Sequence, residues 1–326
     1  MLVTFGELML RLTTPGRQRF AQAESFEVTF GGAEANVAVT VAQLGGGAEF
    51  LTKLPENPVA QRALDELRAL GVRVDRSVRG GDRIGVYFLE QGVGQRPGNV
   101  IYDRAGSAIA MADPAEFDWE SLLAGASWLH WSGITPALSD KAAELTREAV
   151  VAARRLGIRV SFDMNYRAKL WTQERAGQVL RPLVEGAHLC LCGPEEARGI
   201  LGVKSEGEHP VAQELMERYG FKQVAMSRRR AEHADACQWG GAFFEGGQFW
   251  ETPWHEVKIV DRLGAGDSFT GGLIFGLLRG QSPGDALNLA VAVSALKHTI
   301  PGDYARVNLH EAMALVNGVG GGRVRR

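Results

Sequence analysis

The chain has 326 residues, with 36 basic and 38 acidic side chains and a net charge of −2. Non-specific binding of nucleic acid requires a concentrated basic face, so this near-neutral balance predicts that no nucleic acid is bound. No apolar run approaches the roughly 20 residues that span a bilayer, and the N-terminus lacks the basic segment of a secretory signal. The three cysteines form no CxxC pair, which disfavours a disulfide framework and a zinc site. We therefore expect a cytoplasmic protein that binds neither nucleic acid nor membrane.

Short apolar runs alternate with helical patterns along most of the chain. In the first helical pattern, Val37, Val41 and Leu44 recur at the spacing of one helix face. Repeated strand-then-helix units imply a parallel sheet with helices on both faces, so the sequence predicts an α/β fold. The expected strands are 2–5, 50–54, 128–132, 158–162, 188–192 and 224–227, and the expected helices are 34–44, 58–70, 139–156 and 264–278.

Two stretches, 8–30 and 84–104, carry strand-like alternation instead of helical periodicity. Phe26, Val28 and Phe30 show this alternation in the first of them. We interpret both stretches as a small antiparallel sheet inserted into the α/β core. Two hairpins at the edge of the main sheet are the alternative. The resulting division assigns 1–9, 31–82 and 108–326 to the core, and 10–30 and 83–107 to the inserted sheet.

The most informative segment is 261–267, which leads into the last expected helix. Gly264 and Gly266 remove side chains where the chain enters that helix, and the unpaired N–H groups of a helix start favour an anion. Asp267 can accept the proton of an attacking hydroxyl while those N–H groups hold a transferred phosphoryl group. A plain helix cap is the alternative for such a motif taken alone. The sequence has neither a GxxxxGK[ST] nor a GxGxxG motif, which excludes the common phosphate sites.

Two segments together resemble the signatures of the PfkB, or ribokinase-like, family of sugar kinases. One is 261–267, followed by Gly271 and Gly272, and the other is 31–38 near the N-terminus. The resemblance implies a three-layer α/β/α sandwich with a mostly parallel central sheet and a small β-sheet lid, formed by the two inserted stretches. It also implies ATP and Mg²⁺ as cofactors.

The same resemblance implies roles for individual residues. Asp267 falls on the catalytic base. The anion hole, whose backbone amides stabilise the phosphoryl group, falls on Gly264, Ala265 and Gly266. Gly32 and Asn36 fall on the sugar-binding motif, although a glycine pair such as 31–32, taken alone, would indicate only a strand-to-helix turn.

Several further segments resemble one subgroup, the 2-keto-3-deoxygluconate kinases; they are Tyr87, 102–104, 132–138 and 163–167. This resemblance implies that the sugar acid is surrounded by Gly32, Tyr87, Tyr102, Arg104, Ile134 and Arg167. An arginine pair suits such a substrate, because a guanidinium binds a carboxylate as a planar fork. Arg104 and Arg167 also follow expected strands, where α/β folds bind ligands. Surface arginines in ion pairs are the alternative.

Two segments concern the metal and the nucleotide. The segment 194–196 resembles the family's NxxE element, which implies that Glu196 organises Mg²⁺ through water. Gly193 stands where asparagine is often found, and an acidic helix N-terminus is the alternative. Ser227, with Gly264 and Gly266, is implied to contact the nucleotide. The chain departs from the family's glycine-rich turn over 227–239, where three successive arginines either contact phosphates or form a solvated surface.

The combined expectation is an ATP-dependent kinase that converts 2-keto-3-deoxygluconate to its 6-phosphate, with Asp267 as the base. The alternatives are another PfkB sugar kinase, such as a fructokinase or ribokinase-like enzyme, and a non-catalytic sugar or nucleotide sensor on the same fold. The exposed face of a lid favours pairing with a second lid, so we also expect a homodimer.

Overall fold

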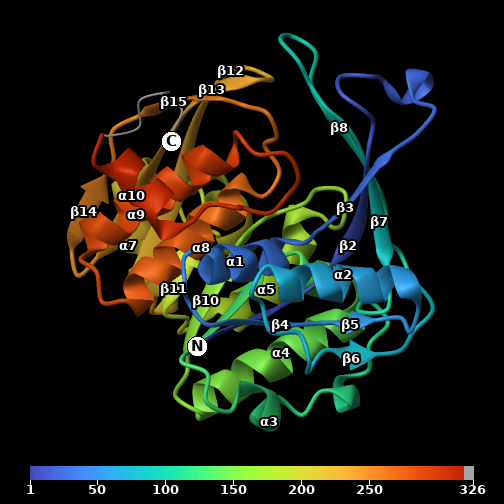
Figure 1. Cartoon of the computed structure of the whole chain (residues 1–326). Coiled ribbons are helices and arrows are strands. Elements are labelled where there is room, and N and C mark those ends of the chain that lie inside the picture. Colours follow the sequence, from blue (N-terminus) through green and yellow to red (C-terminus); the bar gives the residue numbers. More distant parts are fainter. Residues whose placement is uncertain (319–326) are drawn as a thin grey trace.

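The computed structural model describes residues 1–318, apart from the Glu232 side chain. A nine-stranded sheet crosses its centre (Figure 1). The strands are β1 (Leu2–Phe5), β4 (Ala48–Leu51), β9 (Trp128–Ser132), β10 (Arg159–Asp163), β11 (Leu189–Leu191), β12 (Gln223–His233), β13 (Ala236–Glu245), β14 (Gln248–Glu251) and β15 (His255–Lys258). Their order is β14-β13-β12-β11-β10-β9-β1-β4, with β15 paired to β13. All neighbours from β4 to β12 are parallel, which confirms the mostly parallel sheet.

Helices cover both faces of this sheet. The helices are α1 (Ala33–Gln43), α2 (Pro58–Ala69), α3 (Trp119–Leu123), α4 (Asp140–Arg155), α5 (Gln173–Val184), α6 (Pro194–Glu196), α7 (Glu208–Tyr219), α8 (Ala265–Leu278), α9 (Pro283–Lys297) and α10 (Leu309–Val316), with short turns η1 (Phe20–Gln22), η2 (Pro114–Glu116), η3 (Thr135–Ala137) and η4 (Ala197–Leu201). Apolar side chains of α1, α2, α8, α9 and α10 form one core cluster, and those of α3, α4, α5 and α7 form another. Leu2 and Val3 of β1 belong to opposite clusters because strand side chains alternate. The predicted three-layer sandwich is therefore confirmed.

The lid is a separate four-stranded sheet that rises from the core (Figure 1). It consists of β2 (Met9–Thr13), β3 (Glu27–Gly31), β7 (Gly85–Glu90) and β8 (Asn99–Asp103), in the order β3-β2-β7-β8. The hairpins β2–β3 and β7–β8 are each antiparallel. The two central strands of the sheet, β2 and β7, come from different hairpins and are parallel. The prediction of an all-antiparallel sheet is wrong at that pair, because both hairpins leave the core in the same direction and lie side by side. The alternative of hairpins on the main sheet is also wrong.

Two predicted strands have different limits in the structure. The run 50–54 is divided between β4 in the main sheet and β5 (Lys53–Leu54), which pairs with β6 (Val78–Arg79). β12 continues well beyond the predicted end at 227, because its arginine-rich half pairs with β13. The four predicted helices agree with α1, α2, α4 and α8 to within a residue at each end. No helix in the part of the chain that the structure describes is long and apolar enough to cross a membrane.

Candidate active site

The N-terminus of α8 is an open helix end formed by a tight turn. Gly264 caps the helix with φ of 77°, a conformation that favours glycine. A Cβ on Gly264 would lie 1.9 Å from the carbonyl oxygen of Asp303, so the turn fits closely against the 302–303 loop. By contrast, no described atom lies within 4 Å of a Cβ built on Gly266. The Ala265 N–H makes a long hydrogen bond of 3.4 Å to the Arg262 carbonyl oxygen, and the helix start at Gly266 faces open space, which an anion hole requires.

We expect Gly264→Ala to lower kcat about 100-fold, the usual effect of losing one donor to a developing negative charge. The methyl group would displace the turn from Asp303 and move the amides that follow it. Gly280→Ala is the matched control, because Gly280 has a similar φ of 70° but no described atom within 4 Å of its Cβ position. Steady-state kinetics of both variants test the prediction, and equal losses would contradict it.

Asp267, the predicted base, lies in the first turn of α8 and contacts Asn36 of α1. The Asn36 Nδ2 donates to Asp267 Oδ2 at 2.7 Å, and the Gly32 N–H donates to Asn36 Oδ1 at 3.4 Å. Burial raises the pKa of Asp267 to about 6, although the Asn36 hydrogen bond and the charge of Arg167 act in the opposite direction. Asp267 is therefore largely ionised at neutral pH and can accept a proton. The structure thus brings together residues from both sequence signatures.

Two more carboxyl groups adjoin this part of the site: Asp163 lies near Asp267, and Glu196 lies near Asp163. Burial, together with the charges of Asp267 and Glu196, raises the pKa of Asp163 to about 8. Burial also raises the pKa of Glu196, which accepts N–H bonds from Gly193 at 3.3 Å and Tyr166 at 3.4 Å. Within residues 1–318, no group of three His, Cys, Asp or Glu side chains is arranged to hold a metal ion. A metal here would need further ligands from water or substrate.

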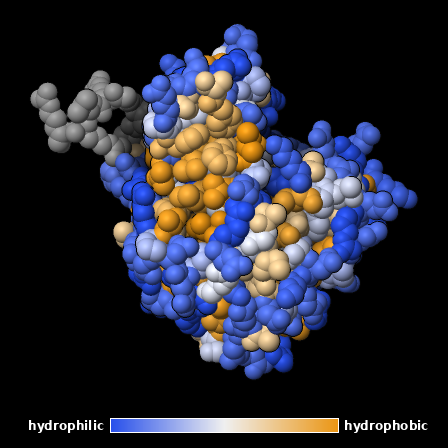
Figure 2. Space-filling model, turned by 90° about the vertical axis from the view of Figure 1, so that its right-hand side faces the viewer, coloured by the Kyte–Doolittle hydropathy of each residue, from blue (hydrophilic) through white to orange (hydrophobic). Residues whose placement is uncertain are grey.

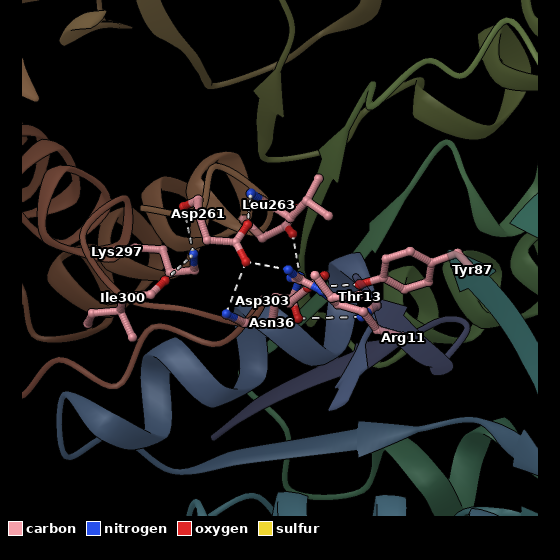
Figure 3. Close-up of polar contacts among 12 residues, drawn as sticks. Arg11, Thr13, Asn36, Tyr87, Asp261, Leu263, Lys297, Ile300 and Asp303 are labelled. Atoms are coloured by element: carbon pink, nitrogen blue, oxygen red, sulfur yellow. Dashed lines mark hydrogen bonds and ion pairs between the residues drawn. The ribbon is translucent and has the colours of Figure 1, made fainter. Parts of the chain in front are cut away.

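A buried charge network joins the lid to the turn before α8 (Figure 3). Arg11 of β2 pairs through Nη2 with Asp261 and through Nη1, at 2.5 Å, with Asp303. Its Nε donates to Thr13 Oγ1 at 2.8 Å. Tyr87, which was predicted to contact the sugar, donates its hydroxyl to Asp303 at 2.7 Å. Arg11 therefore bridges a lid strand and two core carboxylates that sequence reasoning did not connect.

The second cation of this network is Lys297, which is fully buried at the end of α9. Its Nζ donates to the carbonyl oxygens of Asp261 at 3.1 Å and Ile300 at 3.3 Å. The Asp261 carboxylate also accepts the N–H groups of Leu263 and Gly302, at 3.1 and 3.0 Å. Two cations and two carboxylates thus fix the backbone that leads into the anion hole. The sequence signal for this part of the network was Lys297 itself, a charged residue at the end of an otherwise apolar helix.

Arg104, the residue after β8, is buried against the core. Its Nε donates to Glu7 at 2.8 Å, its Nη2 also pairs with Glu7, and Ser107 donates to the same carboxylate at 2.6 Å. The guanidinium lies 5.3 Å from the centre of the Tyr102 ring. Arg104 and Tyr102 line a cleft of about 860 Å³ between lid and core. The predicted residue is at the cleft, but Glu7 already engages two of its nitrogens.

Arg167 lines the same cleft from the opposite side, in the segment after β10. Its Nη1 donates to the carbonyl oxygens of Asn165 and Tyr166, both at 3.2 Å. Asn165 has φ of 42°, the left-handed region that asparagine tolerates better than most residues. This bend aims the segment from the strand end toward the cleft. Arg104 and Arg167 therefore line one cleft.

Ile134, also predicted near the sugar, is buried in a loop that Glu34 holds in place. Glu34 Oε1 accepts the N–H of Ser132 at 3.0 Å, its hydroxyl at 2.7 Å, and the Thr135 hydroxyl at 3.0 Å. Burial raises the pKa of Glu34 to about 7. Sequence reasoning passed over Glu34, although a glutamate within an otherwise apolar helix start was a signal. Ser227, the predicted nucleotide contact, is an exposed residue of β12 in register with Gly241.

The model of the pfkB family of carbohydrate kinases matches residues 1–309. The chain belongs to this family. A crystal structure of 2-dehydro-3-deoxygluconokinase from Thermotoga maritima superposes on this PfkB kinase with a TM-score of 0.95 and 45% sequence identity, covering 97% of this chain and 99% of the other.

Two curated relatives also match over nearly their whole length. The 2-dehydro-3-deoxygalactonokinase of Haloferax volcanii is 37% identical, covering 97% of this chain and 96% of its own. The 2-dehydro-3-deoxygluconokinase of Thermoproteus tenax is 31% identical, with 93% and 89% covered. The predicted family and the enzyme class, carbohydrate kinase, are therefore confirmed.

Proposed function

We propose that this PfkB kinase transfers the γ-phosphoryl group of ATP to a primary hydroxyl of 2-keto-3-deoxygluconate, giving the 6-phosphate and ADP. The hydrogen bond from Asn36 to Asp267 carries the proposal, because it joins the two sequence signatures at an ionisable carboxylate in the first turn of α8, where a helix start favours an anion. Arg104 and Arg167 in the adjoining cleft favour an acidic sugar. The names of the Thermotoga maritima and Thermoproteus tenax relatives support the same substrate.

In the proposed reaction Asp267 accepts the proton of the attacking hydroxyl. The hydroxyl oxygen forms a bond to the γ-phosphorus, while the bond between that phosphorus and the bridging oxygen breaks and leaves its electron pair on ADP. The amides of 264–266 donate to the phosphoryl oxygens as they pass between the two partners. The lid covers the cleft and excludes water, which would otherwise compete as the acceptor.

Mg²⁺ is part of the proposal, and the carboxylates of Asp163 and Glu196 fit it. The negative charge of Glu196 contributes to the raised pKa of Asp163, and a divalent cation would relieve that repulsion. Mg²⁺ binds few protein carboxylates and keeps several waters and phosphate oxygens, which suits the lack of a complete protein ligand set among the described residues. When bound, it would neutralise charge on the phosphates.

The names of the relatives point to two possible configurations of the sugar acid. One curated relative is named for the galactonate form and another for the gluconate form, and these acids are epimers at C4. Release of ADP from Mg-ATP should be measured with both epimers, fructose and ribose, with Asp267→Asn as the blank. We expect turnover with a keto-deoxy acid. Turnover restricted to a neutral sugar would support the kinase activity but refute the proposed sugar-acid substrate.

We expect Arg167→Gln to lower kcat/KM for the sugar acid about 100-fold, because it removes one of the two guanidinium groups proposed to bind the substrate carboxylate. Residual turnover of fructose, where measurable, should change much less. Arg104→Gln should show the same selectivity, but it also leaves Glu7 buried without its ion pair. Arg167→Gln breaks no ion pair among the described residues, although it also removes a charge that lowers the pKa of Asp267.

Arg83→Gln is the control for both variants. Arg83 pairs with Asp103, lies near Arg104 in the sequence, and has a side chain that is 37% exposed. Its replacement should leave both substrates unaffected. Equal losses of acid and neutral-sugar turnover in Arg167→Gln would contradict the carboxylate assignment.

We also propose a homodimer that forms through the outer face of the lid. Phe26, Val28 and Ile101 are 38%, 38% and 47% exposed on that sheet, and Figure 2 shows an apolar expanse on this side of the molecule. Ile101→Glu should shift the mass measured by light scattering from dimer to monomer. Val151→Glu, at a similarly exposed position of α4, should not. A monomeric wild-type chain would contradict the proposal.

The proposed location is the cytoplasm, where ATP is available. Cys190 and Cys192 are buried thiols in and just after β11, which suits a reducing compartment.

A further inference from the structure

Glu7 lies where the lid joins the core. The chain crosses between core and lid in four places: 6–8 before β2, Gly32 after β3, 80–84 before β7 and 104–107 after β8. Figure 1 shows the lid strands rising from the core at this base. Glu7 belongs to the first crossing, and its side chain is only 2% exposed. The structure therefore buries an acidic side chain at the base of the lid.

At each of the other three crossings Glu7 has a close neighbour. A Cβ on Gly32 would lie 2.0 Å from the Glu7 carbonyl oxygen, and a Cβ on Gly85, the first residue of β7, would lie 2.8 Å from Glu7 Oε1. At the last crossing, Ser107 donates its hydroxyl to Oε1 at 2.6 Å, and Arg104 pairs with Oε2. A side chain at either glycine would displace Glu7, so its position is fixed from several sides.

The Glu7 carboxylate uses one edge of the Arg104 guanidinium. The Arg104 Nε donates to Glu7 Oε2 at 2.8 Å, and Nη2 donates to the same oxygen. A guanidinium has five N–H donors, so three remain, one on Nη2 and two on Nη1. Among the residues that the structure describes, only Glu7 accepts hydrogen bonds from Arg104, and Arg104 lines the cleft between lid and core. The edge formed by Nη1 and Nη2 is therefore left for a ligand.

Another buried arginine of this chain binds two carboxylates at once. Arg11 pairs with Asp261 through Nη2 and with Asp303 through Nη1. An arginine held by one carboxylate thus keeps enough donors for a second. The first carboxylate also immobilises a long side chain in advance, so less conformational entropy is lost when a ligand binds.

We propose that Glu7 is a positioning residue that holds Arg104 with its free edge toward the carboxylate of the sugar acid. The proposal rests on the proposed kinase function and adds a residue that determines the preference for acidic over neutral sugars. Glu7 is bonded to Arg104 and Ser107, so it acts through Arg104 and not on the substrate itself. Its charge also compensates the buried guanidinium before the sugar acid binds.

Direct binding of the sugar acid, measured by titration calorimetry without ATP, tests this role. We expect Glu7→Ala to raise the Kd for the sugar acid about tenfold, as for the loss of a charge-assisted hydrogen bond, and to leave the Kd for MgADP unchanged. Glu7→Gln should restore most of the affinity, because its amide oxygen still accepts from Arg104. Glu49→Ala is the matched control. Glu49 is a similarly buried partner of an arginine, Arg76, but it lies in β4 and does not line the cleft, so its Kd should remain that of the wild type.

A double variant separates the positioning of Arg104 from a general role in seating the lid. If Glu7 acts through Arg104, the Kd of Glu7→Ala combined with Arg104→Gln should equal that of Arg104→Gln alone to within about twofold. A role in the lid alone would multiply the two losses. Gly85→Ala keeps both charges but places a methyl group against Glu7 Oε1, so it should also raise the Kd for the sugar acid. This variant decides the question if Glu7→Ala does not fold.

The results also distinguish this inference from the proposed function. An unchanged Kd for the sugar acid in Glu7→Ala or Gly85→Ala, a parallel rise in the Kd for MgADP, or multiplied losses in the double variant would overturn the inference and leave the kinase activity supported. A wild-type chain that phosphorylates another sugar but binds neither keto-deoxy acid would refute the proposed substrate, and this role of Glu7 with it.

Discussion

Asp267→Asn should lower kcat by about 1,000-fold or more, because the hydroxyl of the acceptor then loses its proton acceptor. Asparagine has nearly the same size, and its Oδ1 can still accept the hydrogen bond that Asn36 donates at 2.7 Å. The loss should therefore appear in kcat rather than in substrate affinity. Steady-state kinetics together with calorimetric Kd values for sugar and MgADP measure both quantities.

The raised pKa of Asp267 predicts how kcat/KM depends on pH. Burial raises its pKa to about 6, so the base is protonated below that pH and kcat/KM should fall along an acid limb near pH 6. Asn36→Ala should move this limb upward, because the hydrogen bond from Asn36 lowers the pKa of Asp267. An acid limb that stays in place in Asn36→Ala would show that another group controls it.

Stability should change in the opposite direction to activity. The folded-state pKa of Asp267 lies above the ordinary value of an aspartate, about 3.9, so its favourable contribution is complete below about pH 4 and is lost as the pH rises through 6. Removing the charge in Asp267→Asn avoids the cost of a buried carboxylate at neutral pH. The melting temperature of the variant at pH 7 should thus equal or exceed that of the wild type. Retained turnover in this variant would refute the base assignment.

The local patterns of the sequence were enough to predict the three layers of the fold and the positions of four helices. The glycines of 261–267 predict a helix start, and α8 begins there because Gly264 adopts the φ that the turn requires. The lid was harder, because alternation shows that a segment is a strand but not which strand is its neighbour. The parallel pair of β2 and β7 joins segments more than 70 residues apart, and only the packed structure fixes it.

The polar part of the site depends on contacts between distant residues, which a single sequence does not show. Arg104 was predicted from its context as an open carboxylate-binding group, but Glu7, 97 residues away, holds it in the structure. Arg11 and Asp303 are 292 residues apart, and neither carries a motif. Such pairs form because a charge that enters a buried site must find an opposite charge there, and the fold decides which one is near.

Arg11→Met should destabilise the protein by about 3–5 kcal/mol, because removing one member of a buried ion pair leaves charge without compensation. Arg11 is 2% exposed and is hydrogen-bonded to both Asp261 and Asp303. Lys297 stays near these carboxylates, but its Nζ donates to backbone carbonyls, so one net negative charge would remain buried. Urea denaturation measures the change in the free energy of unfolding.

Arg68→Met is the matched control. Arg68 also has two carboxylate partners, Asp65 and Asp75, but its side chain is 40% exposed and its pairs are screened by water. Its replacement should cost at most about 1 kcal/mol. An equal loss in the two variants would show that the Arg11 network contributes no more than a surface pair.

A double variant identifies the origin of the loss. Asp303→Asn added to Arg11→Met removes the uncompensated charge, so the double variant should be more stable than the sum of the two single changes predicts. Because Asp261 also holds the backbone before Gly264 through the Leu263 N–H, the same Arg11 variant should lower kcat even at temperatures where it is folded. A lid residue that touches no reacting atom would then control the geometry of the anion hole, and normal kcat in folded Arg11→Met would refute that link.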